Sequence, residues 1–211
     1  AGDYQDNAER FGFLAHATLA MAARQTAPYD VIHAHDWQCG LVPALLETTY
    51  AALNGVGRTP TVFTIHNLAY QGLFDVACLR RLGLGPDMAR VEAMEHWGQV
   101  SFLKAGIQFA SILTTVSPRY AMEIQSPELG FGFDSLLRYR ARDLVGILNG
   151  IDYDQWNPAT DVHLPTPFDA SNLAGKDAAK QRLLKDLGLP VTAQTRVRPL
   201  VGLISRLVEQ K

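Results

Sequence analysis

Apolar positions along the chain alternate between a helical period and a strand period. Between residues 7 and 25 they recur at helical spacing, whereas "TVFTI" is a short β-branched run between a proline and an asparagine. The expected helices are Asn7–Gln25, Trp37–Leu53, Gln99–Ala110, one begun by Ser117 and Pro118, and Ala170–Leu187. The expected strands are Val31–Ala34, Thr61–Ile65, Ile112–Val116, Asp143–Leu148 and Pro199–Ser205. This alternation predicts an α/β fold with a parallel sheet flanked by helices.

A proline-rich stretch, Ile151–Ser171, is the best candidate for a linker. It predicts one domain over residues 1–160, and a linker with the start of a second domain over residues 161–211. The chain begins within a helical pattern and stops just after an expected strand. We therefore expect a fragment truncated at both ends.

Composition narrows the classes of partner. The chain has 19 lysine and arginine residues against 21 aspartate and glutamate residues, which gives no electrostatic reason to expect nucleic acid or an anionic membrane. No apolar run reaches the roughly 18 residues of a membrane span, and the polar start of the chain does not resemble a signal peptide. With Cys39 and Cys78 as its only cysteines, the chain is expected to be reduced and cytoplasmic.

Polar residues follow the expected strands one after another. In open parallel sheets, ligands bind beyond the carboxyl ends of the strands, so these residues should gather at one edge. They are His35, Asp36 and Trp37, then His66 and Asn67, then Ser117, then Asn149 and Gly150, and finally Arg206. The pattern predicts a polar pocket built from strand ends.

The segment "HAHDW" leaves three readings open: a metal site, a substrate pocket or ordinary packing. His33 and His35 share one face of the strand while Asp36 faces the other, and no HExxH or CxxC motif occurs, so no metal is expected. His33 alternatively bonds a neighbouring carbonyl in the core. Asp36 alternatively caps the next helix. Trp37 either packs in the core or stacks on a sugar ring.

The later strand ends are also open to two readings each. His66 is either a structural histidine or a partner for a sugar hydroxyl, and Asn149 either makes a tight turn with Gly150 or contacts a ligand. Arg206 and Lys211 suit a diphosphate, or else form a solvated surface pair. No GxGxxG, P-loop or GxSxG motif is present.

Five segments together resemble bacterial glycogen synthase and plant starch synthase, which are retaining glucosyltransferases of two-domain GT-B architecture. The resemblance covers nearly the whole chain, in the family's order. The segments are "HAHDWQCGLVPALL", "TVFTIHNLAYQGLF", "FLKAGIQFASILTTVSPRYAMEI", "ILNGIDYDQWNPATD" and "LVGLISRLVEQK". By this resemblance the sheet is Rossmann-like, and "HAHDW" faces the cleft between the two domains rather than a metal.

The resemblance also implies roles for individual residues. His66, Asp36 and Asn149 match catalytic positions around the donor glucose. Trp37, Tyr70 and Gln71 match positions near the glucan acceptor. Arg206 and Lys211 match the pair that neutralises the donor diphosphate, where fixed cations stabilise the leaving group.

The implied activity is transfer of glucose from ADP-glucose or UDP-glucose to the non-reducing end of an α-1,4-glucan, with retention and without a cofactor. The implied location is the cytoplasm, or the plastid in a plant. The family's Lys-x-Gly-Gly-Leu loop and later acidic motif do not occur here, so we expect the fragment itself to be inactive. The alternatives are another GT-B glucosyltransferase, of sucrose or trehalose type, against which "HNLAYQG" argues, and a non-catalytic carbohydrate-binding module.

Overall fold

The computed structural model describes residues 4–53 and 56–205. The chain forms two compact units, Ala1–Asn149 and Gly150–Lys211. The division therefore falls between Asn149 and Gly150, before the boundary after residue 160 that the linker composition suggested. The two domains, residues 1–160 and 161–211, remain a prediction.

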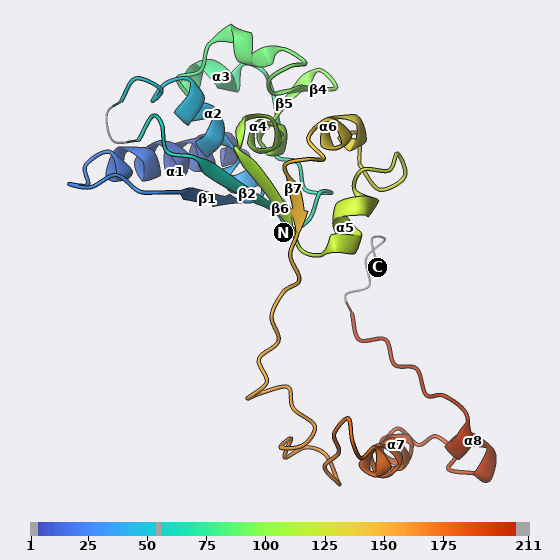
Figure 1. The fold of residues 1–211 in the computed structure, drawn as a ribbon. Helices are drawn as coiled ribbons and strands as arrows, with labels where there is room; N and C mark the ends of the chain where they lie inside the picture. Colours follow the sequence, from blue (N-terminus) through green and yellow to red (C-terminus); the bar gives the residue numbers. More distant parts are fainter. Residues whose placement is uncertain (1–3, 54–55, 206–211) are drawn as a thin grey trace. The chain divides into compact units, whose positions relative to one another are not determined.

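The first unit is built on a parallel sheet of four strands in the order β1-β2-β6-β7 (Figure 1). These strands are β1 (Ile32–His35), β2 (Thr61–Ile65), β6 (Ile112–Thr115) and β7 (Leu144–Gly146). A smaller antiparallel sheet joins β3 (Leu73–Phe74), β5 (Gln99–Ser101) and β4 (Glu95–His96) in that order. The helices of this unit are α1 (Asn7–Ala22), η1 (Trp37–Cys39), α2 (Leu41–Glu47), α3 (Cys78–Arg81), η2 (Pro86–Ala89), α4 (Phe102–Phe109), α5 (Pro118–Glu123) and α6 (Asp134–Tyr139). The predicted α/β class with a parallel sheet is confirmed.

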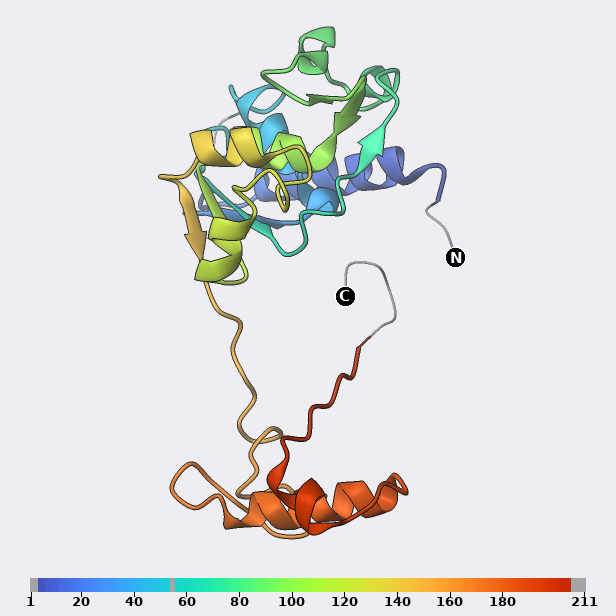
Figure 2. The ribbon, with the colours of Figure 1, turned by 90° about the vertical axis from the view of Figure 1, so that its right-hand side faces the viewer.

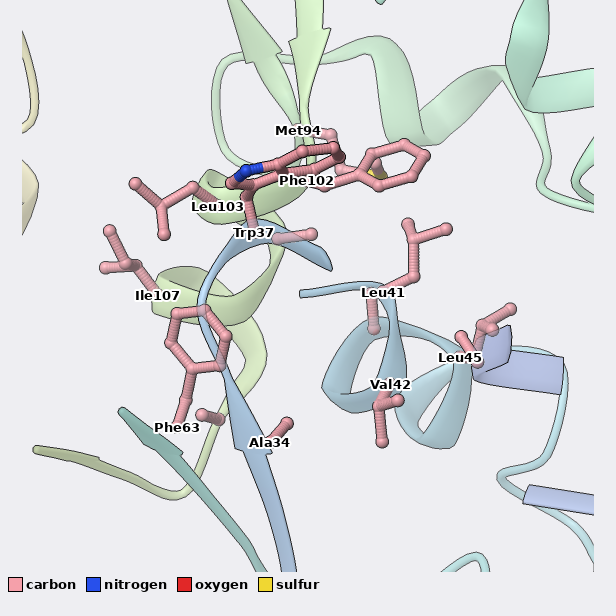
Figure 3. Packing of buried hydrophobic residues seen from close by; sticks show 14 of the residues in the cluster. Ala34, Trp37, Leu41, Val42, Leu45, Phe63, Met94, Phe102, Leu103 and Ile107 are labelled. Atoms are coloured by element: carbon pink, nitrogen blue, oxygen red, sulfur yellow. The ribbon is translucent and has the colours of Figure 1, made fainter. Parts of the chain in front are cut away.

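One face of the parallel sheet carries the hydrophobic core. Phe63 of β2 and Leu113 of β6 are neighbours in register on this face, and both are fully buried. Helices α1, α2 and α4 cover this side (Figure 1), and their apolar side chains fill the space above the strands (Figure 3). A Cβ at Gly106 of α4 would lie 2.3 Å from the Phe63 ring. Only glycine therefore lets α4 approach the sheet this closely.

The opposite face of the same strands is polar. His33 of β1, Thr64 of β2 and Thr114 of β6 form a ladder across three strands, with 2.6 Å between Nε2 of His33 and Oγ1 of Thr64. A second contact of 2.6 Å joins the hydroxyls of Thr64 and Thr114. His33 is exposed and bonds a hydroxyl, so the alternative of a core histidine bonded to a carbonyl is wrong. Because side chains alternate along a strand, one face packs and the other presents polar groups.

Several predicted boundaries are corrected by local interactions. The predicted helix Trp37–Leu53 is instead a 3₁₀ turn followed by α2, which ends at Glu47 before two β-branched threonines. The predicted helix Gln99–Ala110 begins only after Ser101, because Gln99–Ser101 pairs as strand β5 and the Ser101 hydroxyl accepts a hydrogen bond from the backbone of Lys104. Helix α1 likewise stops at Ala22 rather than Gln25.

The second unit contains α7 (Ala174–Asp186) and α8 (Ala193–Val197). The Nζ of Lys180 in α7 donates to the carbonyl oxygens of Arg196 and Arg198, which ties the end of α8 to α7. The predicted strand Pro199–Ser205 is wrong, since these residues are irregular and exposed. An apolar run becomes a strand only beside a partner strand, and the described residues of this unit contain no strand.

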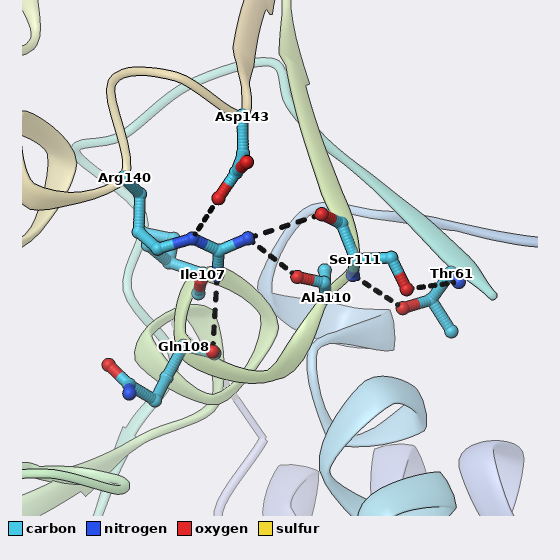
Figure 4. Close-up of polar contacts among 7 residues, drawn as sticks. All are labelled: Thr61, Ile107, Gln108, Ala110, Ser111, Arg140 and Asp143. Atoms are coloured by element: carbon cyan, nitrogen blue, oxygen red, sulfur yellow. Dashed lines mark hydrogen bonds and ion pairs between the residues drawn. The ribbon is translucent and has the colours of Figure 1, made fainter.

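Arg140 joins three elements of the first unit at the end of α4 (Figure 4). Its guanidinium donates to the carbonyl oxygens of Ile107 and Ala110 at 2.7 Å each, and to the Asp143 carboxylate at 2.7 Å. It also donates to the carbonyl oxygens of Gln108 and Ser111. The last carbonyls of a helix have no partner within the helix, so this half-buried cation satisfies groups that would otherwise be left without one.

We expect Arg140→Ala to lower the free energy of unfolding of the chain by about 2–3 kcal/mol, because the charge-assisted bonds to the carbonyls at the end of α4 are lost together. The matched control is Arg119→Ala, whose side chain is 78% exposed and, among the described residues, pairs only with Glu123. That control should change stability by about 0–0.5 kcal/mol. Urea unfolding followed by tryptophan fluorescence measures both, and equal losses would contradict a structural role for Arg140.

Candidate active site

Parallel pairing of β1 with β2 brings the first two polar segments together. The register sets His35 opposite Thr64, and the backbone N–H of Asp36 donates to the carbonyl oxygen of Thr64 at 2.9 Å. The chain of β1 and the chain of β2 therefore end side by side. His35, Asp36 and His66 meet at this edge, as the rule for parallel sheets predicts.

Asp36 has a left-handed backbone, with φ 54°. This conformation is costly for a residue with a side chain, by about 1–3 kcal/mol, and it tends to be kept at functional sites. It turns the carboxylate toward β2, where Oδ1 accepts a hydrogen bond from the backbone N–H of His66 at 2.8 Å. Asp36 occupies the N-cap position of η1, but its side chain makes no capping bond there, so the alternative of a side-chain helix cap is wrong.

Three histidines form a connected group beside this carboxylate. Nδ1 of His35 lies 3.0 Å from Nε2 of His66, and the rings of His33 and His35 contact each other at a tilt of 31°, with centroids 4.1 Å apart. Burial and the neighbouring imidazoles of His33 and His66 lower the pKa of His35, while the Asp36 carboxylate opposes the shift. His35 thus fixes the orientation of the His66 ring, a contact that the sequence motif alone did not reveal.

The loop after β2 is held by side chains from several elements. The phenol oxygen of Tyr120 accepts from the backbone N–H of Leu68 at 3.1 Å, and the Ser101 hydroxyl donates to the Gln71 carbonyl oxygen at 2.8 Å. The amide of Gln71 donates to the Phe131 carbonyl oxygen at 2.8 Å. Residues 66–72 are therefore a fixed surface rather than a free loop.

Next to this loop lies a hollow of about 550 Å³. Tyr70 and Gln71, the predicted acceptor residues, line it together with Trp37. Trp37 is only 9% exposed and lies among the buried side chains of the core (Figure 3). Its ring packs edge-on against Phe11 with centroids 4.8 Å apart. Trp37 therefore forms part of the wall from within the core, whereas the Tyr70 side chain is exposed at the surface.

The remaining predicted residues are not brought into this group by any contact among the described residues. Asn149 is exposed and follows β7 at the end of the first unit. Arg206 and Lys211 lie outside the described residues. Within residues 4–53 and 56–205, no set of three or more His, Cys, Asp or Glu side chains is arranged to hold a metal ion. No helix described is long and apolar enough to cross a membrane.

Comparison with known proteins decides the family. Residues 1–139 match the family model described as the starch synthase catalytic domain. The chain belongs to this family of starch synthase catalytic domains. Its parallel sheet and helices also match a solved structure, the catalytic domain of starch synthase IV from Arabidopsis thaliana bound to ADP and acarbose. The match has a TM-score of 0.78 and 41% identity over 100% of this chain and 43% of that chain.

Curated relatives agree with this assignment. A glycogen synthase from Anaeromyxobacter sp. (strain Fw109-5) is 53% identical over 211 residues, which is all of this chain and 44% of the relative. A glycogen synthase from Desulforudis audaxviator (strain MP104C) is 49% identical over 208 residues, 99% of this chain and 41% of the relative. The chain thus spans less than half the length of the relatives it matches. The resemblance to glycogen and starch synthases is confirmed.

We expect His35 to titrate at a lower pH than a free histidine. Because its pKa is lowered in the folded state, the unfolded chain binds more protons between the two pKa values, and acidification through that window should weaken folding. Proton NMR titration of the imidazole resonances checks this.

His33→Gln serves as the matched variant, because it removes one of the neighbouring imidazoles that oppose protonation of His35. It should raise the His35 pKa part of the way back, since burial remains. A His35 pKa at or above that of free histidine in the unmodified chain would contradict the structure.

Proposed function

We propose that the protein to which this chain contributes transfers glucose from a nucleotide-sugar donor to an α-1,4-glucan, with retention of configuration. The observation that carries the proposal lies at the carboxyl ends of β1 and β2, where the Asp36 carboxylate accepts a hydrogen bond from the backbone N–H of His66 and the His66 imidazole contacts His35. It occurs in a chain that belongs to the starch synthase catalytic domains. ADP or UDP as the nucleotide, and the cytoplasm as the location, are parts of the same proposal.

In this proposal His66 and Asp36 act on the sugar that is transferred. Departure of the nucleotide leaves positive charge on the sugar ring, which a carboxylate stabilises and which strengthens hydrogen bonds from the hydroxyl groups. The imidazole of His66 is held by His35 at 3.0 Å and its backbone by Asp36 at 2.8 Å. Both groups are thus ordered before any substrate binds, which avoids reorganisation during the reaction.

The other predicted residues complete the proposal. Tyr70, Gln71 and Trp37 line the hollow beside this pair, where an acceptor chain would place its terminal sugar. Asn149 would contact the donor glucose from the end of β7. Arg206 and Lys211 would hold the diphosphate and stabilise it as it leaves. No metal enters the proposed reaction.

We expect His66→Ala in the complete protein to lower kcat far more than it weakens donor binding. A hydrogen bond that strengthens as the sugar becomes positively charged acts mainly in the transition state, and its loss should cost about 2–4 kcal/mol. Steady-state kinetics with labelled nucleotide glucose and glycogen measure the effect, with circular dichroism to show that the variant is folded. An increase confined to KM, with kcat intact, would limit His66 to positioning the ground state.

We also expect the purified 211-residue chain to incorporate no labelled glucose into glycogen above a blank without protein. The chain spans 44% of a glycogen synthase relative, and transfer between two substrates depends on groups held on both sides of them. The complete protein, assayed in parallel, is the positive control. Incorporation by the 211-residue chain would show that these residues suffice for the reaction.

A further inference from the structure

Trp97 occupies the tip of the β4–β5 hairpin in an unusual backbone conformation. His96 pairs with Gln99, so the turn consists of Trp97 and Gly98, with φ of 53° and 79°. Two successive residues with positive φ make the turn that hairpins favour, but asparagine and glycine are the residues that suit it. A bulky aromatic residue in this conformation is an outlier.

Packing does not explain the tryptophan. Its side chain is 81% exposed, although a ring of this size normally stays in a core. Phe131 repeats the pattern, with φ 48° and 46% exposure, immediately before Gly132. A Cβ at Gly132 would lie 3.2 Å from Nε1 of Trp97, so the two strained segments lie side by side and a larger residue at position 132 would crowd the indole. Strained positions that present side chains to solvent point to a function.

These segments border a hollow of about 570 Å³ that we call the aromatic hollow, lined by Trp97, Tyr139 and Gly132 among others. Tyr139 is 82% exposed at the end of α6, and both views place α6 and the hairpin beside α4 (Figures 1 and 2). The hollow is also lined by Glu92, Glu95, Gln108 and Ser135, which supply acceptors and donors for hydroxyl groups.

The floor of the aromatic hollow is rigid. The His96 ring stacks on Phe133 with centroids 4.2 Å apart, and Lys104 donates from Nζ to the carbonyl oxygens of Val91 and Glu95 at 2.6 and 2.5 Å. Oε1 of Glu95 accepts from the backbone N–H of Gly98 at 2.8 Å, which fixes the turn itself. The exposed rings are thus presented on a preformed base.

We propose that the aromatic hollow binds a chain of the α-glucan on which the protein acts, away from the end that receives glucose. This proposal rests on the proposed function. The apolar face of a glucose ring stacks on an indole or phenol ring, while its hydroxyls bond carboxylate, amide and hydroxyl groups. Two carboxylates, Glu92 and Glu95, line the hollow beside one cation, Lys104, whose ammonium already donates to two carbonyl oxygens. This excess of negative charge disfavours phosphate groups, so a neutral polysaccharide fits better than a nucleic acid.

The aromatic hollow connects to the candidate acceptor residues through one bond. The amide of Gln71 donates to the Phe131 carbonyl oxygen at 2.8 Å, and Gly132, the next residue, lines the aromatic hollow. A long glucan held there would keep its chain ends at high effective concentration near Tyr70 and Gln71. A short acceptor cannot occupy both places and gains nothing from the hollow.

The test uses Trp97→Asn in the complete protein. Asparagine suits the turn, so the melting temperature should equal or exceed that of the unmodified protein. We expect KM for glycogen to rise about 3- to 10-fold, as loss of one aromatic stacking partner implies, with kcat unchanged and with unaltered kinetics on maltotriose. Phe13→Ala removes an aromatic side chain that is 76% exposed on α1 and is the matched control. It should leave both acceptors unaffected.

Electrophoresis in gels that contain glycogen gives a second measurement, independent of catalysis. Glycogen should retard the unmodified protein and Phe13→Ala, and retard Trp97→Asn less. If no protein transfers glucose but this difference in retardation is seen, the glucan site stands and the proposed function falls. Equal retardation of all three proteins, with equal KM for glycogen, overturns the site and leaves the proposed function intact. If all three proteins are retarded equally but gel filtration shows that Trp97→Asn has lost a dimer, the glucan site is overturned and the aromatic hollow is instead a contact between copies of the chain.

Discussion

The parallel pairing of β1 and β2 is the constraint on which the candidate site depends. Its register sets His35 opposite Thr64, and from that point both chains must turn at the same edge of the sheet. The left-handed turn at Asp36 then directs a carboxylate across to the backbone of His66. A shift of the pairing by one residue would reverse the faces of every side chain on the strand, and the Asp36 carboxylate would no longer reach the backbone N–H of His66.

The division of the sheet into an apolar face and a polar face explains how the same strands serve packing and chemistry. Phe63 faces α4 at the place where Gly106 leaves room for it, while Thr64, the next residue, faces the histidines of β1. Burial of the apolar face stabilises the strands. The polar groups on the other face therefore need not contribute to the core, and packing does not restrict which residues occupy these positions.

The sequence predicted the elements whose signal is local, and missed those that depend on distant partners. Thr61–Ile65 was predicted with its observed bounds because a β-branched run between a proline and an asparagine indicates a strand from local sequence alone. The apolar pattern predicts a helix from Gln99, but Gln99–Ser101 forms a strand because it pairs with residues distant in the sequence. Likewise the family motif predicted Asp36 and His66, but it could not show that His35 holds the His66 ring. The sequence did not predict the strained turn at Trp97, because no motif there indicates a positive φ for a tryptophan.

The left-handed backbone at Trp97 has a consequence for the engineering and evolution of this protein. A screen that selects only for resistance to heat would favour asparagine or glycine at this position, because either relieves the strain of the turn. Selection for growth on polymeric reserves would keep tryptophan at this position, because the exposed ring binds the glucan in the proposed site. The residue found there thus reports which of the two pressures has prevailed, and thermostable variants of this family chosen by melting temperature alone would discard that information.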